Sequence, residues 1–275
     1  MKEETRLLLD VADEYFDAAP RTDAAAETVG AFTLFRSNSV WSYFARPRRG
    51  LKKPVSARDI AALAERCQEL ALDLSLEWIA ELTPSLHGTA EQAGLNIEEH
   101  ALLALAPGDL LPVAPGAGVR VEHLAATDAH LVTARAVAEV AFSVGGTRVG
   151  AAGPRDREER ATHVSDDMRG HLARRAAAGL TVTAVAVGDD DGVLATGSLQ
   201  PVHGTGEVLA VATLPCARRR GLAAAITTSL VQHAERRGVT LLLLSAENND
   251  VARVYQRVGF RRVGTHHSAQ ANGLP

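Results

Sequence analysis

The segment VATLPCARRRGLAAAI (residues 211–226) decides the fold, because the periodicity of the chain changes within it. Its first part is an apolar run that predicts a strand ending at Pro215, and residues 222–234 then repeat apolar side chains at helical spacing. Residues 239–245 (VTLLLLS) follow as a continuous apolar run, which is typical of a strand buried on both faces. A strand, a helix and a buried strand in this order predict a parallel crossover.

Three arginines and a glycine, Arg218, Arg219, Arg220 and Gly221, stand where this helix begins. The first N–H groups of a helix have no internal partner and carry partial positive charge. Gly221 and Ala223 let an anion approach the backbone, and the arginines add charge, so the junction predicts a pyrophosphate site. A basic surface turn before an ordinary helix would look the same in these residues, and the junction alone does not decide between the two.

The rest of the chain suggests two domains of mixed α/β structure. Residues 106–118 (APGDLLPVAPGAG) predict a linker between a domain at 1–112 and a domain at 119–275. In the second, we expect strands at 119–125, 181–187, 193–202 and 207–214, helices at 128–142 and 157–178, and a last helix capped by Asn248 or Asn249 before a final strand from Phe260.

The first domain contains a segment that resembles part of the second. Residues 74–99 align with residues 240–264 when Gly94 is set on Gly259, 165 positions apart. This alignment suggests a duplicated fold, although two strand–helix–strand units also resemble each other by chance. The arginine junction has no counterpart in the first copy, because the aligned segment LKKPVSARD contains no glycine.

Two motifs together resemble the GNAT superfamily of acyl-CoA-dependent N-acetyltransferases. They are Arg218-x-x-Gly221-x-Ala223 after the strand, and Asn248, Tyr255, Gly259 and Phe260 about thirty residues later. The resemblance covers residues 119–269 and implies the GNAT fold, a mixed and mostly antiparallel sheet with a parallel crossover at the cofactor site. The first domain is similar to a degenerate copy of that fold, as in tandem members of the family.

The resemblance implies a set of cofactor-binding residues for acetyl-CoA. Backbone N–H groups of the helix start would bind the pyrophosphate, with the arginine side chains as its rim, and the preceding strand would pair with the pantetheine arm. The residues so implied are Val211, Ala212, Thr213, Arg218, Arg219, Arg220, Gly221, Leu222, Ala223, Asn248 and Tyr255. The resemblance also places the glycine-rich loop after Gly145 at the border of the acceptor site.

Tyr255 and Glu207 are the candidate catalytic residues. A phenol with a pKa of about 10 is protonated at neutral pH and can protonate a departing thiolate. Tyr255 also shares an apolar stripe with its helix neighbours and could simply pack in the core. Glu207 could act as the base that accepts the amine proton, or it could be a solvated hairpin residue; His203 and Glu247 are weaker candidates.

Composition excludes several other classes of protein. A net charge of −4 and a pI near 6.2 argue against a broad basic face for nucleic acid. Cys67 and Cys216 follow no metal spacing and indicate a reducing compartment, and His163 with Asp167 supplies only two ligands, so we expect no metal. The acidic N-terminal segment does not resemble a signal peptide, and no apolar run reaches the length of a membrane helix.

The sequence therefore predicts a cytoplasmic tandem enzyme that moves an acetyl group from acetyl-CoA directly to an unidentified amine, on a small molecule or a peptide. We expect no nucleic-acid or membrane partner and allow for a homodimer. The alternative is a non-catalytic acyl-CoA-binding or sensing module, which would need the loop but not Tyr255.

Overall fold

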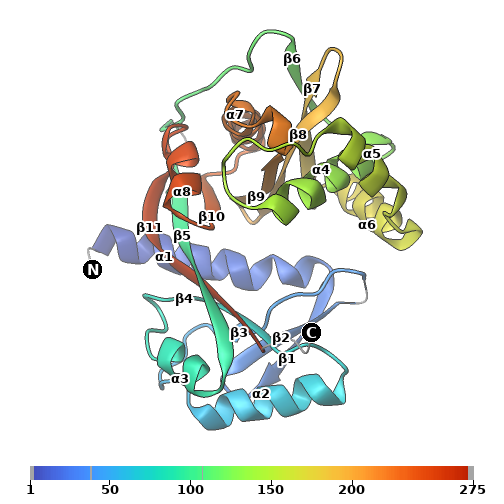
Figure 1. The fold of residues 1–275 in the computed structure, drawn as a ribbon. Helices are drawn as coiled ribbons and strands as arrows, with labels where there is room; N and C mark the ends of the chain where they lie inside the picture. Colours follow the sequence, from blue (N-terminus) through green and yellow to red (C-terminus); the bar gives the residue numbers. More distant parts are fainter. Residues whose placement is uncertain (1–2, 38, 107, 272–275) are drawn as a thin grey trace. The chain divides into compact units, whose positions relative to one another are not determined.

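The computed structural model describes residues 3–37, 39–106 and 108–271, and the chain divides into two compact units (Figure 1). The first unit joins residues up to Leu102 with those from Arg262 onward, and the second runs from Leu103 to Arg261. This division differs from predicted domains at 1–112 and 119–275 because the last strand, β11 (Arg261–Ala271), pairs with a strand of the first unit. The predicted linker includes Pro107, which lies outside the described residues.

The described residues of the first unit form three helices and strands of two sheets. The strands β1 (Ala24–Val29), β2 (Phe32–Ser37) and β3 (Arg46–Pro47) form one antiparallel sheet, and β4 (Ser75–Ile79), β11 and β5 (Leu95–Leu105) lie side by side in the other. The helices are α1 (Glu3–Ala18), α2 (Ala57–Glu69) and α3 (Leu86–Gln92), with a 3-10 turn, η1, at Pro20–Thr22. Buried side chains of α2, α3 and both sheets, Trp78 among them, form its core.

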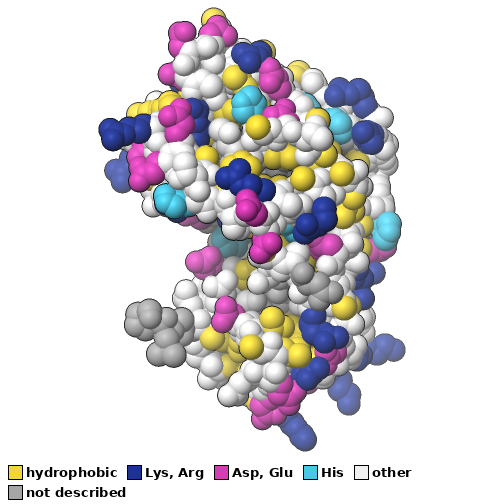
Figure 2. Space-filling view, turned by 90° about the vertical axis from the view of Figure 1, so that its right-hand side faces the viewer, with side chains coloured by type: hydrophobic (Ala, Val, Ile, Leu, Met, Phe, Trp, Pro, Cys, Tyr) yellow, Lys and Arg dark blue, Asp and Glu magenta, His cyan; other side chains and the backbone are white. Residues whose placement is uncertain are grey.

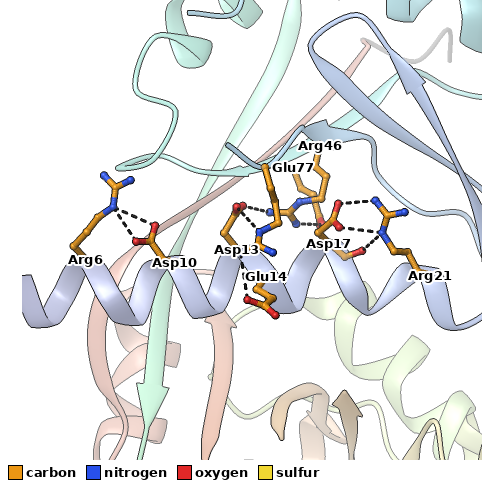
Figure 3. A network of polar contacts seen from close by, with 9 residues as sticks. Arg6, Asp10, Asp13, Glu14, Asp17, Arg21, Arg46 and Glu77 are labelled. Carbon is orange, nitrogen blue, oxygen red and sulfur yellow. Dashed lines mark hydrogen bonds and ion pairs between the residues drawn. The ribbon is translucent and has the colours of Figure 1, made fainter. Parts of the chain in front are cut away.

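A buried arginine, Arg46, links α1 of this unit to β4 through charged hydrogen bonds (Figure 3). Arg46 is fully buried and donates hydrogen bonds to Asp13 on α1 at 2.8 Å and to Glu77 on β4 at 3.0 Å. Its guanidinium also lies over the ring of Phe16, 5.4 Å from the ring centroid. A backbone bridge between Ala45 and Leu76 aligns β3 with β4 and so brings this cation beside Glu77.

The second unit is built on one sheet with the strand order β10-β9-β8-β7-β6. The four strands β6 (Val119–His123), β7 (Val182–Gly188), β8 (Gly192–Val202) and β9 (Thr205–Thr213) are antiparallel neighbours, and β10 (Leu241–Ala246) joins β9 in parallel. Between β9 and β10 the chain forms the 3-10 turn η2 (Pro215–Ala217) and the helix α7 (Leu222–Arg236). The predicted meander and parallel crossover are confirmed.

Helices cover both faces of this sheet (Figure 1). The helix α7 packs on the face of Gly197, where an added Cβ would lie 2.6 Å from Ile226. The helix α4 (His130–Val144) packs on the other face, where Ala138 and Ala141 contact Ala212. The expected single helix at 157–178 is wrong: α5 (Pro154–Thr162) ends at His163, and Ser165 caps a new helix, α6 (Asp166–Ala177).

The repeat at 165 positions extends over several elements. The helices α2 and α7 begin at Ala57 and Leu222, 165 positions apart. The strand β4, helix α3 and strand β5 likewise correspond in order to β10, α8 (Asn249–Gln256) and β11, with starting positions that agree within two residues. The α2 and α7 pair lies outside the original match, so the element order favours duplication over chance.

On the face drawn in Figure 2, basic and acidic side chains are interspersed over the molecule. Within the described ranges, none of the helices combines the length and the apolar character needed to cross a membrane.

Candidate functional site

A bulge interrupts β9 close to its end. The register of β8 and β9 shifts so that Ala210 and Val211 stand opposite Gly197, and Ala210 has a left-handed φ of 51°. A bulge of this kind bends a strand and redirects its backbone groups. The bulge was not predicted, although a glycine within a strand pattern, here Gly197, often marks a bulge or a close approach.

Just before the bulge, β9 and β10 separate. Their parallel register covers three pairs, Leu241 with Thr205, Leu242 with Gly206 and Leu243 with Glu207. Among the described residues no pairing continues beyond Glu207, although β9 runs on to Thr213. The predicted pantetheine-binding residues Val211, Ala212 and Thr213 thus lie on a strand edge whose backbone groups no neighbouring strand occupies. An extended amide chain can add to such an edge.

The start of α7 has unpaired backbone donors. Gly221 is the N-cap residue with φ 79°, and no side chain caps the helix there. The first backbone bond of the helix runs from Ala225 to Gly221, so the N–H groups of Leu222, Ala223 and Ala224 have no helical acceptor. A Cβ on Gly221 would meet nothing within 4 Å, so the glycine is required by its φ and not by crowding.

The arginine side chains at this junction divide into two kinds. Arg219 and Arg220 are exposed, and neither has an ion pair among the described residues. Arg219 also has a left-handed φ of 68°, which is uncommon for a residue with a side chain. Residues 219–223 thus combine unpaired amides with two exposed arginines, and their binding of a pyrophosphate stays a prediction.

Arg218 is engaged elsewhere. Its guanidinium donates to the carbonyl oxygens of Ala141 at 2.8 Å, Gly145 at 2.9 Å and Arg148 at 3.1 Å, and burial lowers its pKa. These acceptors belong to the end of α4 and the glycine-rich loop after it. The side chain that was expected at the phosphate rim thus binds the loop expected to border the acceptor site, and its role toward a cofactor stays a prediction.

Replacing Arg218 with alanine is expected to loosen that loop. The variant loses at least three charged hydrogen bonds to carbonyls, and we expect the free energy of unfolding of the second unit to fall by about 2 kcal/mol. Amide hydrogen exchange of residues 141–150 should accelerate by more than tenfold. Arg219→Ala is the matched control, since Arg219 makes no such bonds. Equal exchange in both variants would contradict this role for Arg218.

The corresponding helix start in the first unit, that of α2, is capped by side chains. Ser56, 165 positions before Gly221, caps α2: its hydroxyl accepts from the backbone N–H of Asp59 at 3.3 Å. The Asp59 carboxylate in turn accepts from the Ser56 hydroxyl at 2.5 Å and from the backbone N–H of Ser56 at 2.9 Å, and these two bonds lower the pKa of Asp59. Of the two described helix starts, that of α2 therefore carries a capping carboxylate of its own, whereas that of α7 carries no side-chain cap.

The second motif lies on α8, which follows β10. The Asn248 side-chain oxygen accepts from the backbone N–H groups of Asp250 and Val251, both at 3.0 Å, so the predicted cap is confirmed. Tyr255 is buried one turn further on, with its ring edge-to-face on Phe260 at 6.3 Å between centroids. Burial raises the pKa of the Tyr255 hydroxyl, which within the described ranges forms no hydrogen bond.

The candidate bases and the His163–Asp167 pair lie in different parts of the second unit. Glu207 occupies the last paired position of β9 before the strands separate. His203 lies in the turn before β9 and lines, with His123 and His233, a hollow of about 410 Å³. Glu247 is exposed after β10. His163 ends α5 whereas Asp167 belongs to α6, so the two do not share one helix as expected.

Comparisons with known proteins agree with this arrangement. The model of a family described as FR47-like protein matches residues 183–268, from β7 to β11. A search of curated proteins finds no match to the chain. Among solved structures, a GCN5-related N-acetyltransferase from Kribbella flavida is 21% identical with a TM-score of 0.73, and the match covers 97% of this chain and 96% of that one.

Two further structures extend over almost the whole chain. A tandem GNAT protein from the clavulanic acid biosynthesis pathway is 14% identical with a TM-score of 0.58, covering 98% of this chain and 94% of its own. A GCN5-related N-acetyltransferase-like protein from Streptococcus suis is 13% identical with a TM-score of 0.57, covering 98% of each. The chain therefore has the fold of the GCN5-related N-acetyltransferases, GNAT, and carries FR47-like sequence over residues 183–268.

Proposed function

We propose that the second unit binds acetyl-CoA and transfers its acetyl group directly to an amine. One observation carries the proposal: the start of α7 is uncapped and flanked by two exposed arginines, whereas the equivalent start of α2 is closed by Ser56 and Asp59. Unpaired amides at a helix start and cationic side chains together bind phosphate groups. The fold supports the same chemistry, because its structural relatives are named as N-acetyltransferases or GNAT proteins.

The residues present fit coenzyme A as a co-substrate. The N–H groups at residues 219–223 would bind the pyrophosphate, and the free edge of β9 at Val211, Ala212 and Thr213 would pair with the pantetheine amides. Asn248 uses its side-chain oxygen as a helix cap, which leaves its amide NH₂ available to a ligand. Coenzyme A supplies the acetyl group as a thioester, whose carbonyl carbon an amine can attack.

Tyr255 would donate a proton to the leaving sulfur, and Glu207 would accept one from the amine. As the new C–N bond forms and the C–S bond breaks, the sulfur needs a proton and the nitrogen must lose one. The Tyr255 hydroxyl, like an ordinary tyrosine hydroxyl, is protonated at neutral pH and can donate to the sulfur. Glu207, at the point where β9 and β10 separate, would accept the amine proton, directly or through water. A backbone N–H near Ala212 would stabilise the carbonyl oxygen.

Binding and turnover are tested separately. We expect coenzyme A to bind the full chain in calorimetry, and a panel of primary amines to contain at least one that accelerates acetyl-CoA consumption. Consumption is better followed by chromatography than with a thiol reagent, because Cys216 is an exposed free thiol. Absence of coenzyme A binding would overturn the proposal, and binding without any active amine would favour the acyl-CoA-sensing alternative.

Tyr255→Phe should separate catalysis from binding. With the best amine of the panel, we expect kcat to fall about a hundredfold, because the variant keeps the packed ring but has no proton to donate. The dissociation constant of coenzyme A should change by less than about twofold. Tyr43→Phe, which removes a hydroxyl that binds Asp23 in the first unit, is the control and should keep full activity. An unchanged kcat in Tyr255→Phe would remove this residue from the mechanism.

A further inference from the structure

Three metal-binding side chains of the first unit meet from three different elements. His87 lies on α3, Glu99 on β5 and His267 on β11. One ligand atom from each lies within 4.8 Å of the other two. These residues are separated by up to 180 positions in the sequence, so spacing alone could not suggest the cluster.

The separations are close to those of a tetrahedral zinc site. Two ligand atoms that are each about 2.1 Å from a tetrahedral ion lie about 3.4 Å apart. The Glu99 carboxylate oxygen Oε1 is already 3.3 Å from Nε2 of His267. His87 would have to approach by about 1.4 Å at most, and its side chain is 37% exposed on a short helix. A small rotation can therefore complete the geometry.

The chemistry of the three groups favours Zn²⁺ over Mg²⁺ or Ca²⁺. Two imidazoles and one carboxylate are a donor set that binds zinc, whereas the harder cations prefer oxygen ligands alone. The Nδ1 atom of His267 is buried without a hydrogen-bond partner in the described part of the chain, while its Nε2 atom faces the Glu99 carboxylate.

The ring of His267 is also held in place by its neighbours. Trp78 on β4 packs edge-to-face against it, with 4.9 Å between ring centroids, and the His87 ring is 5.1 Å away on another side. Glu99 is 63% exposed, so water can reach the cluster and fill the remaining coordination position. A buried histidine beside two more exposed side chains leaves a route by which an ion can enter.

We infer that His87, Glu99 and His267 bind one Zn²⁺ ion that ties α3 to β5 and β11. This site is separate from the proposed acetyl-transfer residues, which all belong to the second unit, and its test does not depend on activity. The ion would cross-link three elements of the first unit, and in particular would hold the C-terminal strand β11 in its sheet. Zinc binding should therefore stabilise the first unit against unfolding.

The test is a titration of the chelator-treated full chain with ZnCl₂. Calorimetry should show one saturable site per chain, which Mg²⁺ at the same concentration does not occupy. Glu99→Gln and His87→Ala should each weaken binding by at least about tenfold. The matched controls are Glu98→Gln, a neighbouring exposed carboxylate, and His163→Ala, an exposed histidine of the second unit, and both should bind as the parent does.

A second measurement uses Trp78 as an internal probe of position. In a Trp41→Phe background, Trp78 is the sole tryptophan, and Co²⁺ bound beside His267 should quench its fluorescence, with Zn²⁺ competing for the site. The urea midpoint of the same signal should rise when Zn²⁺ is added to the parent but not to Glu99→Gln. Absence of saturable binding, or equal affinity in the parent and both ligand variants, would overturn the inference.

Discussion

Ala223→Asp is expected to abolish coenzyme A binding while leaving α7 intact. Ala223 is the second residue of the helix and one of the three whose backbone N–H groups have no helical acceptor. A carboxylate there would face the same partial positive charge that is proposed to bind the pyrophosphate. The helix would gain about 0.3–1 kcal/mol from the favourable charge at its N-terminus, so loss of binding cannot be attributed to unfolding.

The size of the effect follows from charge repulsion. Two like charges about 4 Å apart near a protein surface repel by about 4 kcal/mol, which corresponds to about a thousandfold in the dissociation constant. The first unit also has a carboxylate in the first turn of its corresponding helix: Asp59 of α2, which corresponds to Ala224 at 165 positions apart. The substitution places a similar charge one residue earlier in α7.

Ala223→Asn is the matched control, because asparagine has nearly the shape of aspartate without its charge. We expect it to weaken coenzyme A binding by less than about tenfold in calorimetry. Circular dichroism and the thermal midpoint should show that both variants keep the fold. If Asp and Asn weaken binding equally, crowding and not charge is responsible; if neither weakens it, the pyrophosphate binds elsewhere and the proposed function loses its main support.

Much of the second unit could be predicted because local patterns decide its elements. The change from alternating to helical spacing after Pro215 located β9 and α7, and the continuous apolar run identified β10. Asn248 or Asn249 was expected to cap α8, and the structure shows Asn248 in that position. The break between α5 and α6 was missed because Ser165, an N-cap residue, lies within a segment whose composition suits a helix throughout.

The rest of the site depends on contacts between distant residues. Nothing near Arg218 shows that its guanidinium binds carbonyls of the loop more than seventy positions earlier. The bulge at Ala210 arises from the fit of β9 to β8 and α7 at Gly197. His87, Glu99 and His267 come together only because β11 returns to the first unit, a step that the predicted domain bounds did not include.

Arg46→Ala is expected to destabilise the first unit more than any other single truncation considered above. Removing one partner of a buried ion pair leaves a buried charge without compensation and costs about 3–5 kcal/mol. In this unit, Glu77 would lose its cation and the Phe16 ring its stacked guanidinium. Urea unfolding followed by tryptophan fluorescence measures this unit specifically, because Trp41 and Trp78 are the two tryptophans of the chain and both belong to it.

The same helix provides the control (Figure 3). Arg6 pairs with Asp10 on α1 at 3.1 Å, but both side chains are about half exposed. Exposed pairs contribute at most about 1 kcal/mol, so Arg6→Ala should shift the free energy of unfolding far less. The double variant Arg46→Met/Glu77→Gln, in which the buried charge is removed together with its partner, should recover part of the loss. An Arg46→Ala variant as stable as Arg6→Ala would show that the network does not hold the unit together.

The loss in Arg46→Ala should also depend on pH. Burial raises the pKa of Glu77 and Arg46 opposes that rise, so the substitution moves the folded-state pKa further above its unfolded value. A carboxyl whose pKa is higher in the folded state contributes its full stabilisation at pH values below its pKa in the unfolded chain. This contribution is lost as the pH rises through its pKa in the folded state. The Nε2 atom of His266 lies 3.7 Å from the Glu77 carboxylate. Burial, and after it the charge of Arg46, lower the pKa of His266 to about 3. Removing Arg46 raises that pKa, so protonation of His266 at low pH destabilises the variant less than the parent.

Both groups therefore make the deficit of Arg46→Ala relative to the parent shrink as the pH is lowered from about 8 to about 5. Asp13, which also faces the cluster, raises the pKa of Glu77 and adds to the same trend. The measurement is the difference in urea midpoint between variant and parent at each pH, with Arg6→Ala expected to show a small difference that varies little. A deficit that stays constant over this range would mean that Arg46 contributes through packing on Phe16 and not through its charge.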